Sequence, residues 1–70
     1  MDRESIESSM IKSLGYDASS FLLEVEFTNG KVYQYLDVLP DVYSSLVDSD
    51  SVGKSFIALI KKPGYEHIQL

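Results

Sequence analysis

Hydrophobic and polar side chains alternate most regularly in one segment of the first half of the chain. Residues 21–27 read Phe-Leu-Leu-Glu-Val-Glu-Phe, with an apolar residue at every odd position. A period of two is typical of an antiparallel strand that buries one face. A strand is also predicted upstream, over Met10–Tyr16, and the Asn29-Gly30 dipeptide predicts a hairpin turn into a third strand, Lys31–Leu36.

The hairpin turn is compatible with two registers that differ by one residue. A two-residue type I′ loop pairs Thr28 with Lys31. A three-residue loop, with Gly30 in a left-handed bulge position, pairs Phe27 with Lys31 instead. Because successive side chains of a strand point to opposite faces, the register decides which face the later residues occupy.

The side chains that depend on this register are Tyr33 and Tyr35. In the first register they lie with the glutamates on an open face, where aromatic rings can stack on single-stranded bases. In the second they are buried on the core face, with their hydroxyls at the rim. We favour the second register, because it sets Glu24 opposite Gln34 and so pairs polar with polar residues.

Two helices are predicted to follow the strands. Pro40 suits the first turn of the earlier helix, because the amide hydrogen that proline lacks has no partner in that turn. The apolar positions of this helix are Val42, Tyr43, Leu46 and Val47. The later helix has one apolar stripe, formed by Val52, Phe56, Leu59 and Ile60. Its opposite face carries Lys54, Ala58 and Lys61.

These elements predict one small α+β domain over residues 8–70, in the order β-β-β-α-α, behind a loose N-terminus at residues 1–7. The sheet is predicted to be three-stranded and antiparallel, with both helices packed on one face. The tail from residue 65 to 70 is expected to lie along the sheet. The predicted core consists of Phe21, Leu23, Val25, Phe27, Val42, Leu46, Phe56, Leu59 and Ile60.

The composition excludes several kinds of chemistry. The chain has no cysteine, so disulfides and thiolate ligands are absent, and its single histidine has no partner for a histidine-based site. We therefore predict no enzymatic activity, no metal and no cofactor. No apolar run reaches the ~18 residues of a membrane span, and the first residues lack a signal-peptide pattern, so we expect a small cytoplasmic protein that does not bind membranes.

Acidic residues dominate the chain, but unevenly. The net charge is −5, from 11 acidic and 6 basic residues, which disfavours sequence-independent binding to duplex DNA. Residues 51–70 nevertheless carry three lysines against one glutamate. These lysines suit the last turn of a solvated helix, where the helix dipole favours cations. They also suit a nucleic-acid-binding surface, which we predict to comprise Lys54, Lys61, Lys62, Tyr65, Tyr33 and Tyr35.

An acidic interaction surface is the alternative prediction. Glu24 and Glu26 lie two apart on one strand, and Asp37 follows the next strand. Such a face would dock on a basic partner protein and would make the chain a protein-interaction or inhibitor module of the kind that phages encode.

Several residues, in this order and spacing, resemble the KTSC family. They are Ser9 with Ile11, Gly15-Tyr16, Phe27-x-x-Gly30, Tyr33-x-Tyr35, Val38 to Pro40, Tyr43, Ser51-x-Gly53, Phe56, Ile60-Lys61 and Tyr65. The chain departs from the family at Leu39, which separates Val38 from Pro40 where the family more often has these two residues adjacent. The family is a short domain named for its place at the C-terminus of some lysyl-tRNA synthetases, and it also occurs as stand-alone bacterial or phage proteins. The resemblance implies no catalytic residues, and it implies a non-enzymatic binding module with RNA as the partner.

Overall fold

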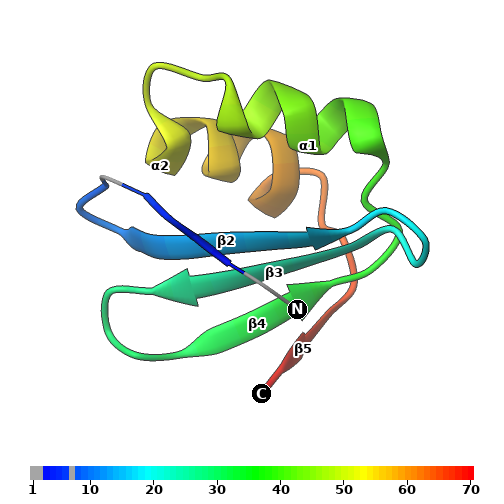
Figure 1. Ribbon diagram of the computed structural model, residues 1–70, viewed down its shortest axis with the longest axis horizontal. Coiled ribbons are helices and arrows are strands. Elements are labelled where there is room, and N and C mark those ends of the chain that lie inside the picture. The colour runs from blue at the N-terminus through cyan, green and yellow to red at the C-terminus, as the bar shows by residue number, and fades with distance from the viewer. Residues whose placement is uncertain (1–2, 7) are drawn as a thin grey trace.

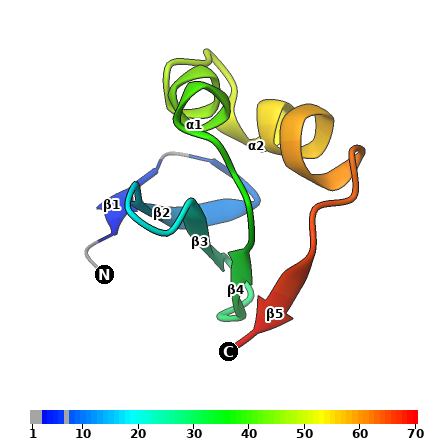
Figure 2. The ribbon, with the colours of Figure 1, turned by 90° about the vertical axis from the view of Figure 1, so that its right-hand side faces the viewer.

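The sheet consists of five antiparallel strands that follow one another in sequence order, as the computed structural model shows for residues 3–6 and 8–70 (Figure 1). The strands are β1 (Glu4–Ser5), β2 (Ile11–Asp17), β3 (Leu22–Phe27), β4 (Val32–Tyr35) and β5 (His67–Gln69). The helical segments are α1 (Pro40–Val47), α2 (Val52–Phe56) and the π-helical η1 (Ile57–Lys61). Figure 2 shows that all three lie on the same side of the sheet.

The α+β class with two helices on one face is confirmed, but the prediction of three strands is wrong. The two additional strands are the sheet edges, β1 and β5. β1 lies within the segment predicted to be loose, of which residues 1, 2 and 7 lie outside the described residues. Both edge strands are short and exposed at every position. The pairing of β5 with β4 confirms that the tail lies along the sheet, although the tail was not predicted to be a strand. Neither edge strand has a buried face, so no burial pattern marks it in the sequence.

The hairpin between β3 and β4 has the three-residue loop that we favoured. Gly30 has φ 88°, and its amide donates to the Phe27 carbonyl at 3.0 Å. The Phe27 amide in turn donates to the Lys31 carbonyl at 2.9 Å. Glu24 therefore pairs with Gln34, while the two tyrosines of β4 pair with the core residues Leu23 and Val25. Tyr35 is buried as predicted, whereas Tyr33 is only half-buried.

All but one of the predicted core residues lie in or against the core, which also contains Ile11, Leu14 and Val38, three residues that were not predicted. Leu23, Val25, Leu46, Phe56 and Ile60 are fully buried, and Phe27, Val42 and Leu59 pack against them. Phe21 is instead 41% exposed, because it lies in a turn with φ 54° that directs its side chain outward. Its carbonyl accepts a hydrogen bond from the Val38 amide at 2.8 Å, so its backbone ties the turn to the segment before α1.

The second predicted helix consists of two parts with different hydrogen bonding. In η1 the Lys62 amide donates to the Ile57 carbonyl at 2.9 Å, which is the i→i−5 bond of a π-helix. Residues five apart lie on nearly the same face of such a turn, so Lys61 lies toward the face of Phe56 and lines the cleft, although its side chain remains exposed. None of the helices in the described part of the chain is long and apolar enough to cross a membrane.

Candidate functional site

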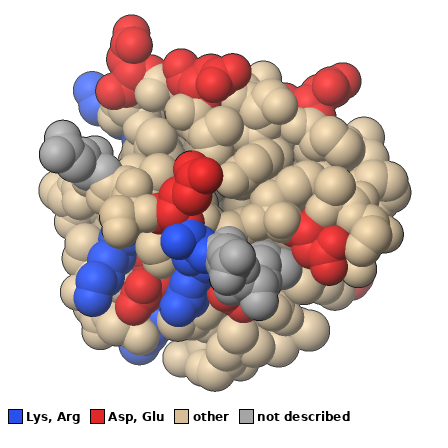
Figure 3. Space-filling view, viewed as in Figure 1, with Lys and Arg blue, Asp and Glu red and all other residues tan. Residues whose placement is uncertain are grey.

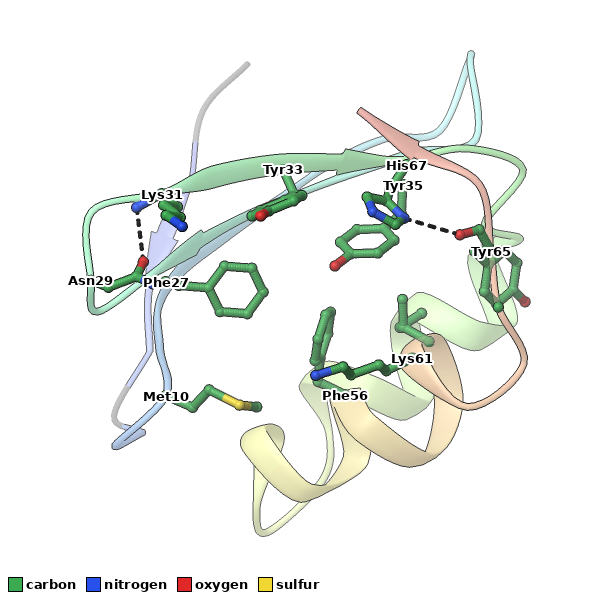
Figure 4. A pocket seen from close by; sticks show the side chains of 12 residues that line it. Met10, Phe27, Asn29, Lys31, Tyr33, Tyr35, Phe56, Lys61, Tyr65 and His67 are labelled. Carbon is green, nitrogen blue, oxygen red and sulfur yellow. Dashed lines mark hydrogen bonds between the residues drawn. The ribbon is translucent and has the colours of Figure 1, made fainter. Parts of the chain in front are cut away.

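A cleft of about 390 Å³ opens between the sheet and the second helix (Figure 4). Its sheet side is formed by the core face of β3, β4 and β5, and its helix side by α2 and η1. The lining residues are Met10, Phe27, Asn29, Lys31, Tyr33, Tyr35, Phe56, Ile60, Lys61, Gly64, Tyr65 and His67. This volume lies within the range of small-molecule sites, which is about 300–1,000 Å³.

Four aromatic rings that line the cleft each contact the next, so that together they form a closed circuit. Their centroids are separated by 5.6 Å (Phe27–Tyr33), 6.4 Å (Tyr33–Tyr35), 5.5 Å (Tyr35–Phe56) and 5.5 Å (Phe56–Phe27). His67 extends the circuit from β5, with its ring 5.3 Å from that of Tyr35 and 5.6 Å from that of Tyr33. His67 pairs directly with Tyr35 across the strands, and cross-strand partners share a face of the sheet.

The two tyrosine hydroxyls in this circuit have different surroundings. The Tyr33 hydroxyl donates to Oε1 of Gln69 at 3.3 Å. Figure 4 shows the Tyr35 hydroxyl directed into the space between the sheet and the helix. Burial, with a smaller contribution from Tyr33, raises the pKa of Tyr35 above its ordinary value near 10, so its phenol remains protonated at neutral pH.

The cleft also differs in charge from the rest of the molecule. Lys31 lines it from the sheet side and Lys61 from the helix side. None of the acidic residues in the described part of the chain lines it, although the whole chain has 11 of them. In Figure 3 acidic side chains follow the helical layer at the top, and most of the visible cations lie over the sheet below.

The structure gathers some of the residues predicted to bind nucleic acid and separates others. Tyr33, Tyr35, Lys61 and Tyr65 all line the cleft. Lys54 instead lines a smaller hollow beside residues 8–10, at the start of α2. Lys62 is exposed just after η1 and does not line the cleft.

Sequence reasoning did not predict Phe27, Lys31, Phe56 and His67 as site residues. Phe27 and Phe56 were placed in the core, where their contacts do lie, and His67 was expected on the surface. Of these positions, only Lys31 was indicated by the favoured hairpin register, because that register pairs Lys31 with Phe27. The other side of the cleft depends on how the helix packs, which no local pattern encodes.

The predicted acidic interaction face is not an open surface. Glu24 is 9% exposed and accepts a hydrogen bond from Nε2 of Gln34 at 3.0 Å. Glu26 accepts one from the Ser13 hydroxyl at 2.9 Å. Arg3 lies over both carboxylates, with N–O distances of 3.4 Å to Glu24 and 3.9 Å to Glu26. These two glutamates are therefore partly engaged within the domain, and their charge is partly offset by Arg3.

The third acid of that predicted face, Asp37, is exposed in the turn between β4 and α1, with φ 59°. Among residues 3–6 and 8–70, no hydrogen bond or ion pair joins its side chain to the network of Glu24 and Glu26. The same residues contain no group of three or more histidine, aspartate or glutamate side chains that could hold a metal ion.

Replacing Arg3 with alanine tests whether this network stabilises the sheet. We expect Arg3→Ala to lower the free energy of unfolding by about 1 kcal/mol, because it leaves two neighbouring carboxylates to repel one another. Urea denaturation measures the change, and added salt should reduce it. Lys12→Ala, which removes an exposed cation from β2, is the matched control. Equal effects of the two substitutions would show that the ion pairs contribute nothing specific.

Three comparisons relate the chain to known proteins. The family model described as the KTSC domain matches residues 7–65. An uncharacterized protein of Stutzerimonas stutzeri is 40% identical over 67 residues, which cover 96% of this chain and 94% of that protein. The crystal structure of a KTSC domain protein from Yersinia pestis superposes with a TM-score of 0.92 at 30% identity, over 99% of this chain and 96% of that one.

A longer protein also contains a similar segment. A lysine–tRNA ligase of Nostoc punctiforme is 38% identical over 55 residues, which cover 79% of this chain but 10% of the ligase.

Proposed function

This chain belongs to the KTSC domain family, and from that premise we propose that it is a non-enzymatic module that binds single-stranded RNA in the aromatic cleft. The observation that carries the proposal is the lining of the cleft. Five aromatic side chains, a histidine and two lysines converge there, without any acidic residue of the described chain.

Each part of this lining suits one part of a nucleotide. Aromatic rings stack on bases with about 1–3 kcal/mol per base, and every base offers a π-face. Lys31 and Lys61, on opposite sides of the cleft, suit the phosphates that precede and follow a stacked base. A cationic ligand fits less well, because the same two lysines would repel it.

The size and charge of the molecule favour a single strand over a duplex. The cleft has the volume of a small-ligand site, and a base inside a duplex cannot leave its stack to enter it without a cost. Outside the cleft, a net charge of −5 repels the phosphates along the flanks of a duplex.

The relative in Nostoc punctiforme supports RNA as the partner. That protein is named as a ligase of lysine and tRNA, so a segment similar to this one occurs in a protein that acts on RNA. The alternative, an acidic module for a basic protein, lacks comparable support, because Arg3 covers the two glutamates that would carry it and offsets part of their charge.

Two double variants, each of which loses two positive charges, test the proposal. We expect Lys31→Gln with Lys61→Gln to weaken binding of a short single-stranded RNA by at least tenfold. The salt dependence should also become shallower, by about 0.7 in the slope of log K against log salt for each lost phosphate contact. Fluorescence anisotropy with a labelled RNA, at several salt concentrations, measures both quantities.

The control is Lys54→Gln with Lys62→Gln, which removes the same charge from exposed positions outside the cleft. We expect it to leave the affinity within about twofold. Equal losses in both double variants would show that binding depends on the overall charge of the molecule and not on the cleft. The absence of RNA binding by the parent protein would refute the proposed function.

A further inference from the structure

The Tyr35 hydroxyl lies in the aromatic circuit and forms no hydrogen bond within the described part of the chain, in contrast to the hydroxyls of Tyr16 and Tyr33. No buried side-chain nitrogen or oxygen in that part of the chain lacks a partner. The oxygen of Tyr35 must therefore be accessible, although the residue as a whole is only 8% exposed.

This combination of a fixed ring and an accessible hydroxyl is unusual for a core residue. The ring of Tyr35 is held by Phe56 at 5.5 Å, by His67 at 5.3 Å and by its pairing with Leu23 on β3. Its hydroxyl therefore has a defined position and points into the cleft (Figure 4). A ligand that meets this oxygen meets a preorganised group, so a hydrogen bond to it needs no further ordering of the side chain.

We propose that the cleft takes up one unpaired base of the RNA and that Tyr35 hydrogen-bonds the edge of this base. The inference rests on the proposed function, and it specifies both the ligand unit and the residue that reads it. The neighbouring ring faces of Tyr33 and His67 provide the stacking surface, at 6.4 Å and 5.3 Å from the Tyr35 ring.

The chemistry of the hydroxyl favours a base edge over a phosphate. A neutral phenol can both donate and accept, as the edges of all four bases require. The side chains around the Tyr35 hydroxyl are mainly aromatic rings, whereas the two lysines offer phosphates a full positive charge from the two sides of the cleft. A base stacked on the open side of these rings would therefore turn its edge to Tyr35 while its phosphates remain near the lysines.

The test compares two variants in which phenylalanine replaces tyrosine, so that each variant loses one hydroxyl. Tyr35→Phe keeps the ring and breaks no hydrogen bond within the described protein, so its stability should equal that of the parent. We expect it to bind the preferred of four short homopolymers (oligo-A, oligo-C, oligo-G and oligo-U) about three- to tenfold more weakly, the loss of one hydrogen bond. The differences in affinity among the four homopolymers should also become smaller.

Tyr43→Phe is the matched control, because Tyr43 does not line the cleft and its substitution also removes one hydroxyl. We expect it to change neither the affinity nor the preference among homopolymers by more than about twofold. Proton NMR adds an independent readout: a nucleoside monophosphate should shift the ring resonances of Tyr35 and Tyr33 but not those of Tyr16 and Tyr43, which stack on each other at 4.5 Å elsewhere in the fold.

The possible failures are distinguishable. If Tyr35→Phe binds all four homopolymers as the parent does, while the double variant of Lys31 and Lys61 has lost binding, the proposed function stands and the role of Tyr35 is wrong. If the monophosphate shifts no ring in the cleft, no base enters it. If the parent binds no RNA, both proposals fail together.

Discussion

Replacing Phe56 with alanine is expected to lower the free energy of unfolding by about 3–5 kcal/mol, the usual cost of deleting a buried aromatic ring. Phe56 is 1% exposed and meets both Phe27 and Tyr35 edge-to-face at 5.5 Å. A domain of this length has a total stability of roughly 4–10 kcal/mol, so the substitution removes a large share of it and the variant should unfold at a much lower urea concentration than the parent. Circular dichroism during urea denaturation measures the loss.

The adjacent residue provides the control for this substitution. Ile57 is 39% exposed, and Ile57→Ala removes an aliphatic side chain from the same helical segment. We expect a loss of about 1 kcal/mol or less, because only part of the side chain is withdrawn from water. A Phe56→Ala protein that unfolds at the urea concentration of the parent would show that this ring does not hold the helix against the sheet.

Replacing Gly30 with valine is expected to lower the stability by about 2 kcal/mol or more. Gly30 has φ 88°, a conformation that costs roughly 1–2 kcal/mol for an ordinary residue and more for a β-branched one. A Cβ at this position would meet nothing within 4 Å, so the penalty comes from the backbone and not from a clash. Thermal unfolding measures the effect, at about 4–8 °C per kcal/mol for a domain of this size.

Gly30→Asn separates backbone strain from the mere presence of a side chain. Asparagine adopts left-handed backbone angles several times more readily than most residues, so we expect this variant to lose less than half as much stability as the valine variant. If asparagine and valine destabilise equally, the turn does not need the conformation that the structure gives it. The result also bears on the cleft, because a slip by one residue would carry Tyr33 and Tyr35 to the other face of the sheet.

The parts of the fold that could be predicted from the sequence are those where a buried face alternates with an open one. β3 carries such a pattern, and the pairing of Glu24 with Gln34 then selects the hairpin register. β5 carries no such pattern, since all three of its residues are exposed. Its pairing with β4 depends on where the second helix delivers the chain, which is a property of the whole fold.

The candidate site was only partly predictable for a related reason. Its sheet side follows from the hairpin register, but its helix side depends on the π-helical turn. The spacing from Phe56 to Ile60 suits an α-helix equally well, so nothing in the pattern indicates that Lys61 turns toward the cleft. Tyr33 was expected either in the core or on an open platform. It is half-buried, because the core face itself is left open at β4.

The pairing of β5 with β4 has a consequence for the order in which the domain folds. β1 to β4 each pair with the preceding or following strand along the chain, so these hairpins can form by closing short loops. β5 pairs with β4 across a segment that contains both helices, so we expect this pairing to form after the hairpins, because closing the longer loop costs more entropy. We therefore expect the side of the cleft that carries His67 to form late, and, since β5 has no buried residue, to detach readily. A nucleotide held against His67 would favour the paired state of β5, so binding of the ligand would stabilise the pairing of β5 with β4.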